Sequence, residues 1–167
     1  MCHDFGVSLI TRALLLIDVV DSTKLSQALG DVRMAQVWAA HDRLARDMLM
    51  LHNGKEIDKT DGFLLLFESA SEAATCAVAY HRAIAGLDPP LRARAGLHVG
   101  EIILTQNTAA DVARGAKPLE LDGLAKPTAA RIMGLAIGGQ TLLSAAAHAA
   151  LAPTPDGLSV RDRKSVV

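Results

Sequence analysis

Two acidic residues, Asp18 and Asp61, have surroundings that suit metal chemistry. Asp18 follows the apolar run Leu14–Ile17, and Asp61 precedes Gly62 in the link between two predicted short strands, residues 55–58 and 63–67. A carboxylate inside a buried strand is costly unless it is paired or bound to a metal. Mg²⁺ and Mn²⁺ prefer such oxygen ligands and are usually held by a few carboxylates together with substrate phosphates. The two acids are therefore candidate ligands of a metal pair that activates a hydroxyl and neutralises a leaving group.

The residues after Asp18 have the composition of a helix start. Val20, Asp21, Ser22 and Thr23 precede a run at helical spacing, and the free N–H groups of a helix N-terminus can cradle phosphate. The alternative is that Asp21 and Ser22 are N-caps and that Asp61 is a hairpin residue. For Asp21 taken alone, the cap is the better interpretation.

These residues need a sheet to bring them together, and the hydrophobic pattern predicts one. It predicts strands at 12–20, 55–58, 63–67, 91–99, 101–104 and 140–143, and helices at 24–52 (broken at Gly30), 69–85, 123–137 and 144–151. Residues 105–122 are polar and predict a functional loop or arm. The order β, α, β, β, α, β is typical of an α+β, ferredoxin-like (palm-type) antiparallel sheet with helices on one face.

Composition limits the partners. The chain has 167 residues, enough for one domain. No apolar run approaches the ~20 residues that span a bilayer, and the first residues lack the features of a signal peptide, so we expect a cytoplasmic protein without a membrane segment. A net charge of -1 with interspersed signs, and 3% aromatic residues, make nucleic acid a poor partner.

The histidines fit structural roles better than catalytic ones. His98 lies in a predicted strand and is expected to be packed or hydrogen-bonded, whereas His41 and His52 are expected on a solvated helix face. No His or Cys cluster has zinc-site spacing.

Several segments, in order along the chain, resemble the motifs of class III adenylate and guanylate cyclases. Residues 16–23, Leu-Ile-Asp-Val-Val-Asp-Ser-Thr, resemble the family's Phe-x-Asp-Ile-x-Gly-Ser-Thr opening. Residues 59–67 resemble its Gly-Asp-Gly-Phe hairpin, and residues 94–101 its Arg-x-Gly-Leu-His-x-Gly-Glu strand. Residues 129–132 and 139–144 are similar to its late helix and strand. The resemblance implies the class III cyclase fold over residues 1–161.

The resemblance also implies an activity. Asp18 and Asp61 would bind two Mg²⁺ or Mn²⁺ ions with help from the Val19 carbonyl, and residues 20–23 (Val20, Asp21, Ser22 and Thr23) would face the triphosphate. The reaction implied is conversion of ATP or GTP to a 3′,5′-cyclic nucleotide and pyrophosphate, for intracellular signalling. By the family's spacing, Glu120 falls on the base-selecting position and Arg131 on the transition-state arginine. Each active site would lie between the subunits of a homodimer.

The sequence departs from the family at positions that bind base and ribose. Pro127 replaces the ribose-binding Asn, and Ile57 replaces the base-selecting Lys four residues before Asp61, although Lys59 is close enough to substitute. Thr60 replaces the Gly before Asp61. These changes leave two alternatives open: a degenerate cyclase-homology domain that binds nucleotide or a partner without catalysis, and a phosphotransferase of another palm-like family.

The last residues, 162–167, read Asp-Arg-Lys-Ser-Val-Val. A common sequencing adapter encodes this string in one frame before a stop codon, and a cyclase domain normally continues into further strands. We expect residues 162–167 to be a non-native tail and the domain to be incomplete at its C-terminus; a short natural basic tail is the alternative.

Overall fold

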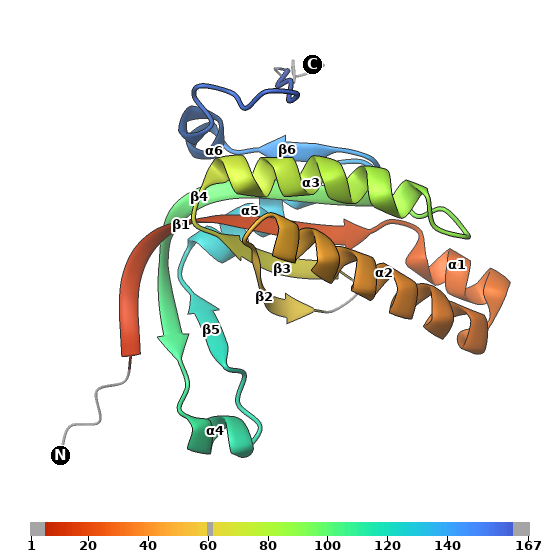
Figure 1. The fold of residues 1–167 in the computed structure, drawn as a ribbon, viewed down its shortest axis with the longest axis horizontal. Helices are drawn as coiled ribbons and strands as arrows, with labels where there is room; N and C mark the ends of the chain where they lie inside the picture. Colours follow the sequence, from red (N-terminus) through yellow and green to blue (C-terminus); the bar gives the residue numbers. More distant parts are fainter. Residues whose placement is uncertain (1–5, 60–61, 162–167) are drawn as a thin grey trace.

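A computed structural model describes residues 6–59 and 62–161 (Figure 1). Thr60, Asp61 and the predicted tail 162–167 lie outside the described residues. The strands are β1 (Gly6–Val19), β2 (Lys55–Lys59), β3 (Gly62–Phe67), β4 (Ala93–Gln106), β5 (Leu119–Asp122) and β6 (Thr141–Leu143). The helices are α1 (Ser22–Leu29), α2 (Asp31–Leu51), α3 (Ala70–Ala85), α4 (Ala109–Ala113), α5 (Ala125–Gly134) and α6 (Ala145–Ala150).

The sheet has the predicted ferredoxin-like topology. Its strand order is β2-β3-β1-β4-β5, all antiparallel, and β6 adds a parallel pairing to β4. β1 lies in the middle, where Asp18 is opposite Gly62 on one side and Arg94 on the other. The predicted α+β fold is therefore confirmed.

Strands β1, β4 and β5 differ from their predictions, and β5 lies within residues 105–122, which were expected as a loop or arm. Residues 91–104 were expected as two strands around Gly100, but β4 runs unbroken from Ala93 to Gln106. It pairs along its whole length with β1, which begins at Gly6 rather than Arg12. This long ladder provides partners for the backbone hydrogen-bonding groups on both sides of Gly100, so the glycine does not end the strand. It leaves room for α5 instead, because a Cβ there would crowd Ala125 and the His98 ring.

The two faces of the sheet are covered unequally. Figure 1 shows α2 and α3 in front of the sheet and α5 behind it. The main core lies on the first face, where Ala13, Leu15, Ile17 and Val19 of β1 pack with residues of α2, α3 and α6. A smaller core on the second face includes Leu14 and residues of α5. The prediction of helices on one face was thus wrong for α5. Among the described helices, none combines the length and apolarity needed to cross a bilayer.

The alternation of β1 decides where Asp18 points. Successive side chains of a strand face opposite sides of the sheet, so Leu14, Leu16 and Asp18 share the second face. The apolar residues between them fill the main core. Asp18 is therefore held on the thinly covered face by the burial of its own neighbours.

We expect Gly96 to be essential for the close packing of α5 on β4. A Cβ on Gly96 would collide with main-chain atoms of Ala129 and Met133, whereas one on Gly134 meets nothing. Gly96→Ala should therefore lower the free energy of unfolding by about 1–3 kcal/mol. Gly134→Ala should leave it unchanged or raise it by up to about 1 kcal/mol. Urea denaturation measures both, and equal losses in the two variants would contradict the close approach.

Candidate functional site

Asp18 forms an ion pair with Arg94 across the β1–β4 ladder. Arg94 Nε and Nη2 lie 2.9 Å and 2.8 Å from Asp18 Oδ2. About a third of each side chain is exposed, 30% for Asp18 and 36% for Arg94. Among the described residues, no group donates a hydrogen bond to the other oxygen, Oδ1. The carboxylate is thus stabilised by Arg94 through one of its two oxygens.

Arg94 is a site residue that sequence reasoning quoted only within a motif. The signal that identifies it is register: a basic residue on the strand antiparallel to β1, directly opposite Asp18. Strand pairing is a long-range contact, so this partner became visible only in the structure.

The segment after Asp18 turns into α1 and encloses a hollow of about 400 Å³, which we call the Asp18 hollow. Its lining joins the end of β1, the first turn of α1 and one residue of β4: Asp18, Val19, Val20, Asp21, Ser22, Thr23, Lys24 and Arg94. The first N–H groups of a helix have no intrahelical partner. The hollow therefore offers these donors and a guanidinium beside a carboxylate.

Asp21 is at the N-cap position of α1, but its side chain does not cap the helix. It instead forms an ion pair with Lys24, with Oδ1 and Nζ 2.8 Å apart, and this contact lowers the pKa of the Asp21 carboxyl. The cap interpretation of its side chain was wrong because the backbone has a φ of 57°. This left-handed region suits Gly, and Asp tolerates it better than most residues. Asp21 replaces the Gly of the resembled motif and keeps a glycine-like backbone.

Two further hollows follow on the second face. The central hollow, about 220 Å³, shares Asp18 with the first and is lined by Leu16, Ile17, Asp18, Asp58, Phe63, Leu64, Lys126 and Met133. The arm hollow, about 360 Å³, lies beside the polar arm formed by residues 107–118, and it shares Asp58 and Lys126 with the central one. Its remaining lining is Ile57, Gly115, Ala116, Lys117, Leu119, Glu120, Leu121 and Asp122. The shared residues place the three hollows next to one another, from Asp18 to the arm.

A β-bulge at the edge of the sheet decides which residue of β2 faces the central and arm hollows. The β2–β3 register shifts between Glu56 and Asp58, and Ile57 is buried in the smaller core. A bulge places two consecutive residues on one face. Asp58 therefore lines the central and arm hollows beside Ile57, which sequence counting had placed at the base-selecting position.

Lys59 points to the other side of the sheet. Its ammonium forms an ion pair with Asp42 of α2, and it lines none of the three hollows. The expectation that Lys59 substitutes for the base-selecting Lys is therefore not supported by its position. The cause is the alternation of the strand: Lys59 follows Asp58, and Asp58 already faces the hollows.

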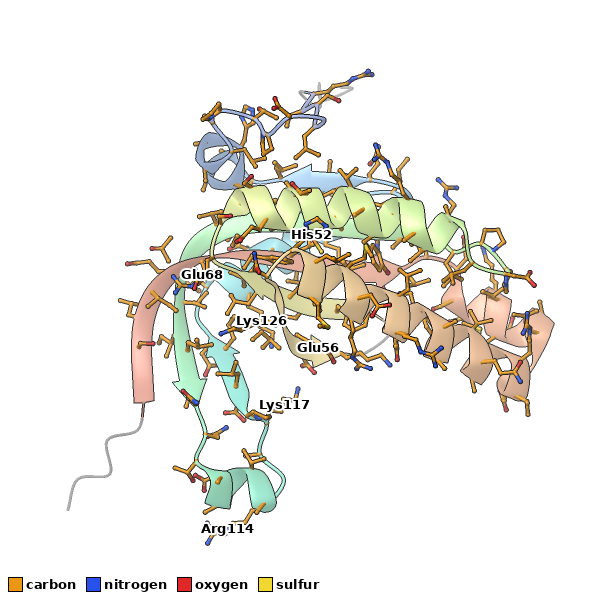
Figure 2. The ribbon with its side chains drawn as sticks, in the orientation of Figure 1. His52, Glu56, Glu68, Arg114, Lys117 and Lys126 are labelled. Carbon is orange, nitrogen blue, oxygen red and sulfur yellow. The ribbon has the colours of Figure 1, made fainter. Side chains whose placement is uncertain are left out.

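The arm reaches the same place. Figure 2 shows Lys117 reaching from the arm toward β2, with Arg114 at the arm's tip. Lys117 hydrogen-bonds to Asp58, and this contact, with a smaller effect of Lys126, lowers the pKa of the Asp58 carboxyl. Glu120 of β5 also lines the arm hollow. The predicted base-selecting residue is thus joined there by two further carboxylates, Asp58 and Asp122, and by the ammonium groups of Lys117 and Lys126.

α5 carries the last predicted catalytic residue. Arg131 is exposed and lines none of the three hollows. Within residues 6–59 and 62–161 it makes no ion pair. Pro127 is tolerated because it is the third residue of α5, in the turn where N–H groups have no helical partner.

The predicted metal ligands are only partly described. Asp61 lies outside the described residues, and a search of the others finds no cluster of three or more His, Cys, Asp or Glu side chains that could hold a metal. Asp18, with a free oxygen and the adjoining Val19 main chain, fits a metal that is held by few protein ligands and by substrate phosphates. Gly62, opposite Asp18, has no room for a side chain, because a Cβ would collide with the Ile17 carbonyl.

The histidines divide into one expected and one unexpected case. His98 Nδ1 lies 2.9 Å from Ser144 Oγ, which confirms a hydrogen-bonded role. His41 was expected on a solvated face, but it is 1% exposed. Its side chain lies between α2, α3 and the sheet, a tertiary burial that the helical spacing of α2 did not reveal.

Comparison with known structures identifies the fold. The adenylyl cyclase CyaB of P. aeruginosa matches with a TM-score of 0.78 and 14% identity over 89% of this chain and 83% of that one. The guanylyl cyclase Cya2 matches with a TM-score of 0.78 and 20% identity over 96% and 88%. A dimeric guanylyl cyclase domain from Blastocladiella emersonii gives 0.79 and 14% over 87% and 86%. The chain has the fold of class III nucleotidyl cyclase domains.

Sequence comparison adds relatives without a described activity. Uncharacterised proteins of Mycobacterium tuberculosis and Mycobacterium bovis are 34% identical over 139 residues. The match covers 81% of this chain and 43% of each relative, so the chain spans less than half of their length. No protein-family model matches the sequence.

We expect the charge of Asp21 to weaken anion binding in the Asp18 hollow. Asp21→Asn removes the charge and keeps a residue that tolerates a left-handed backbone. It should tighten the binding of inorganic tripolyphosphate by roughly fivefold. Isothermal titration calorimetry measures this, with Asp31→Asn, in the first turn of α2, as the control. Equal gains in both variants would indicate a general charge effect instead.

Proposed function

We propose that this chain is a nucleotidyl cyclase domain that converts ATP or GTP to a 3′,5′-cyclic nucleotide and pyrophosphate in intracellular signalling. The observation that carries the proposal is the Asp18 hollow: a half-buried carboxylate, a guanidinium and the first turn of a helix meet in a cyclase fold. The substrate's ribose 3′-hydroxyl would attack its own α-phosphate.

The metal part of the site centres on Asp18. Its free oxygen, the Val19 carbonyl and, from the sequence motif, Asp61 would hold two Mg²⁺ or Mn²⁺ ions. When bound, the ions would lower the pKa of the attacking hydroxyl and offset charge on the leaving pyrophosphate. Few protein ligands suffice because the phosphates supply the others.

The triphosphate would lie in the Asp18 hollow. The first-turn N–H groups of α1, at Ser22 and Thr23, would donate hydrogen bonds to phosphate oxygens. Arg94 adds a guanidinium, which matches phosphate geometry. In the free protein Arg94 neutralises Asp18; with a metal on Asp18, the same guanidinium is available to the phosphates.

The remaining catalytic group would come from a second subunit. Arg131 is exposed and outside the three hollows, so it would act on the Asp18 hollow of the partner in a homodimer, where it would stabilise charge on the phosphoryl oxygens. Three apolar side chains flanking α5, Leu124, Leu135 and Ile137, are more than half exposed. Their contact with a second copy would bury this apolar surface.

Removal of the Asp18 charge tests the proposal. Asp18→Asn should lower cyclic nucleotide formation by about 100-fold or more, because a metal ligand is lost. The control is Glu68→Gln, directly after the opposite end of β3. Cyclic product is measured with Mg²⁺ and with Mn²⁺ from ATP, GTP, CTP and UTP.

The same assay addresses the degenerate alternative, which the apolar Pro127 favours. Nucleotide binding without cyclic product, unchanged by Asp18→Asn, would establish a binding module. Products other than cyclic nucleotides would indicate a different phosphotransferase.

We expect Asp58 to favour guanine. A carboxylate only accepts hydrogen bonds; guanine offers it two neighbouring donors, N1–H and N2–H, while adenine offers one amino group. Lys126 would donate to guanine O6 or adenine N1. The additional charged hydrogen bond, about 1.5 kcal/mol, predicts a kcat/KM for GTP roughly tenfold above that for ATP. Asp58→Asn should reduce this ratio toward one, and Glu68→Gln should not. An ATP preference in the unmodified protein would contradict the assignment.

A further inference from the structure

A chain of polar side chains, buried at Tyr80 and His41, joins α3, α2 and the end of β2. Tyr80 Oη lies 2.7 Å from His41 Nε2, and His41 Nδ1 lies 3.1 Å from Asp42 Oδ1. The other oxygen of Asp42 pairs with Lys59. These residues do not take part in the proposed reaction.

The partners of His41 define its protonation state. Burial lowers the pKa of His41, and its hydrogen bond to Asp42 only partly opposes this effect. A neutral ring has one donor and one acceptor. The arrangement in which the Tyr80 hydroxyl donates to Nε2 and Nδ1–H donates to Asp42 satisfies both nitrogens, while the charge of Asp42 is balanced by Lys59. The chain is therefore a fully satisfied network, which holds its members in one geometry.

This network lies directly behind the Asp18 end of the sheet. Lys59 is paired in register with Phe63, whose ring stacks on His41 with centroids 5.6 Å apart. Phe63 is paired with Ile17, and the next pair in the ladder is Gly62 with Asp18. β3, the strand that borders Asp18 through Gly62, thus contacts the His41 network through Phe63, one residue pair away from Asp18.

Electrostatics shows the same proximity. Burial and the carboxylates of Asp42 and Asp18 raise the pKa of Tyr80. Tyr80 therefore lies within range of the Asp18 charge, on the opposite face of the sheet.

We propose that His41, held by Tyr80 and Asp42, is a positioning residue for the metal site at Asp18. The network anchors the end of β2 and the start of β3 to α2 and α3, and this anchorage fixes the strand beside Asp18. The inference rests on the proposed function, since it concerns that same metal site. It does not make His41 a catalytic residue.

A second contact between α2 and β2 offers a matched comparison. Arg46 of α2 and Glu56 of β2 form an ion pair, with Nε and Oε2 2.8 Å apart. Figure 2 shows Glu56 at β2. This pair also joins α2 to β2, but among the described residues no hydrogen bond or ion pair links it to the His41 network. Glu56→Gln thus weakens the contact between α2 and β2 without changing the His41 network.

The test compares Tyr80→Phe and Asp42→Asn with Glu56→Gln. Mn²⁺ affinity is measured by electron paramagnetic resonance with a non-hydrolysable GTP analogue present, and hydrogen exchange is followed in β2 and β3. Tyr80→Phe and Asp42→Asn should weaken Mn²⁺ binding by about tenfold, as loss of supporting residues around metal ligands does. They should also speed exchange at the start of β3, while KM for GTP changes by less than about twofold. Glu56→Gln should retain the Mn²⁺ affinity of the unmodified protein.

Two outcomes would overturn the positioning role. One is unchanged Mn²⁺ affinity in Tyr80→Phe and Asp42→Asn despite lower thermal stability, and the other is equal weakening in Glu56→Gln. The absence of Mn²⁺ binding in the unmodified protein would instead refute the proposed metal site itself. The two failures are therefore distinguishable.

Discussion

The pairing of β1 with both β3 and β4 is the constraint on which the rest of the structure depends. Because β1 is central and pairs antiparallel on both sides, its register places Gly62 and Arg94 on either side of Asp18. The alternation of β1 then separates two environments: Ile17 and Val19 fill the main core, while Asp18 faces the thinly covered side. A one-residue slip of β1 would exchange these faces and bury the carboxylate among α2 and α3. The hydrophobic effect that stabilises the main core therefore also sets the orientation of the candidate site.

Ion pairs across strands then organise the residues that the ladder brings together. On the second face, Asp18 pairs with Arg94 and Asp58 with Lys117. Both pairs are partly exposed, and such pairs contribute little to stability, so their value lies in placing charge where a ligand would enter. On the first face, Asp42 pairs with Lys59 next to the buried His41. Here removal of Lys59 would leave the Asp42 carboxylate, which is only 15% exposed, without its counter-ion, and this is a larger cost. The first face thus provides rigidity, and the second provides adaptable charge.

The fold and the place of Asp18 near the end of β1 were predictable because they depend on local patterns and chain order. The apolar run before Asp18, the break at Gly30 and the caps of α3 and α6 all have local signals. The failures share a physical cause, which is contact between residues far apart in the chain. The burial of His41 depends on Tyr80 and Phe63 from other elements. The continuity of β4 through Gly100 depends on its long partner strand. Counting along the chain did not reveal that Asp58 lines the central and arm hollows, because a bulge, which has no local signature here, shifts the register by one residue.

The turn after Asp18 shows that geometry and charge can change independently at a ligand site. Asp21 stands where the resembled motif has Gly, yet its backbone retains a left-handed φ of 57°. A residue with a bulky or β-branched side chain would strain this conformation, and the direction of the first turn of α1 would change with it. Asp preserves the path of the chain and adds a negative charge, which Lys24 partly offsets. The residue types that the backbone tolerates at this position are therefore few. Among them, the choice of side chain would change the affinity of the Asp18 hollow for an anion without altering its shape.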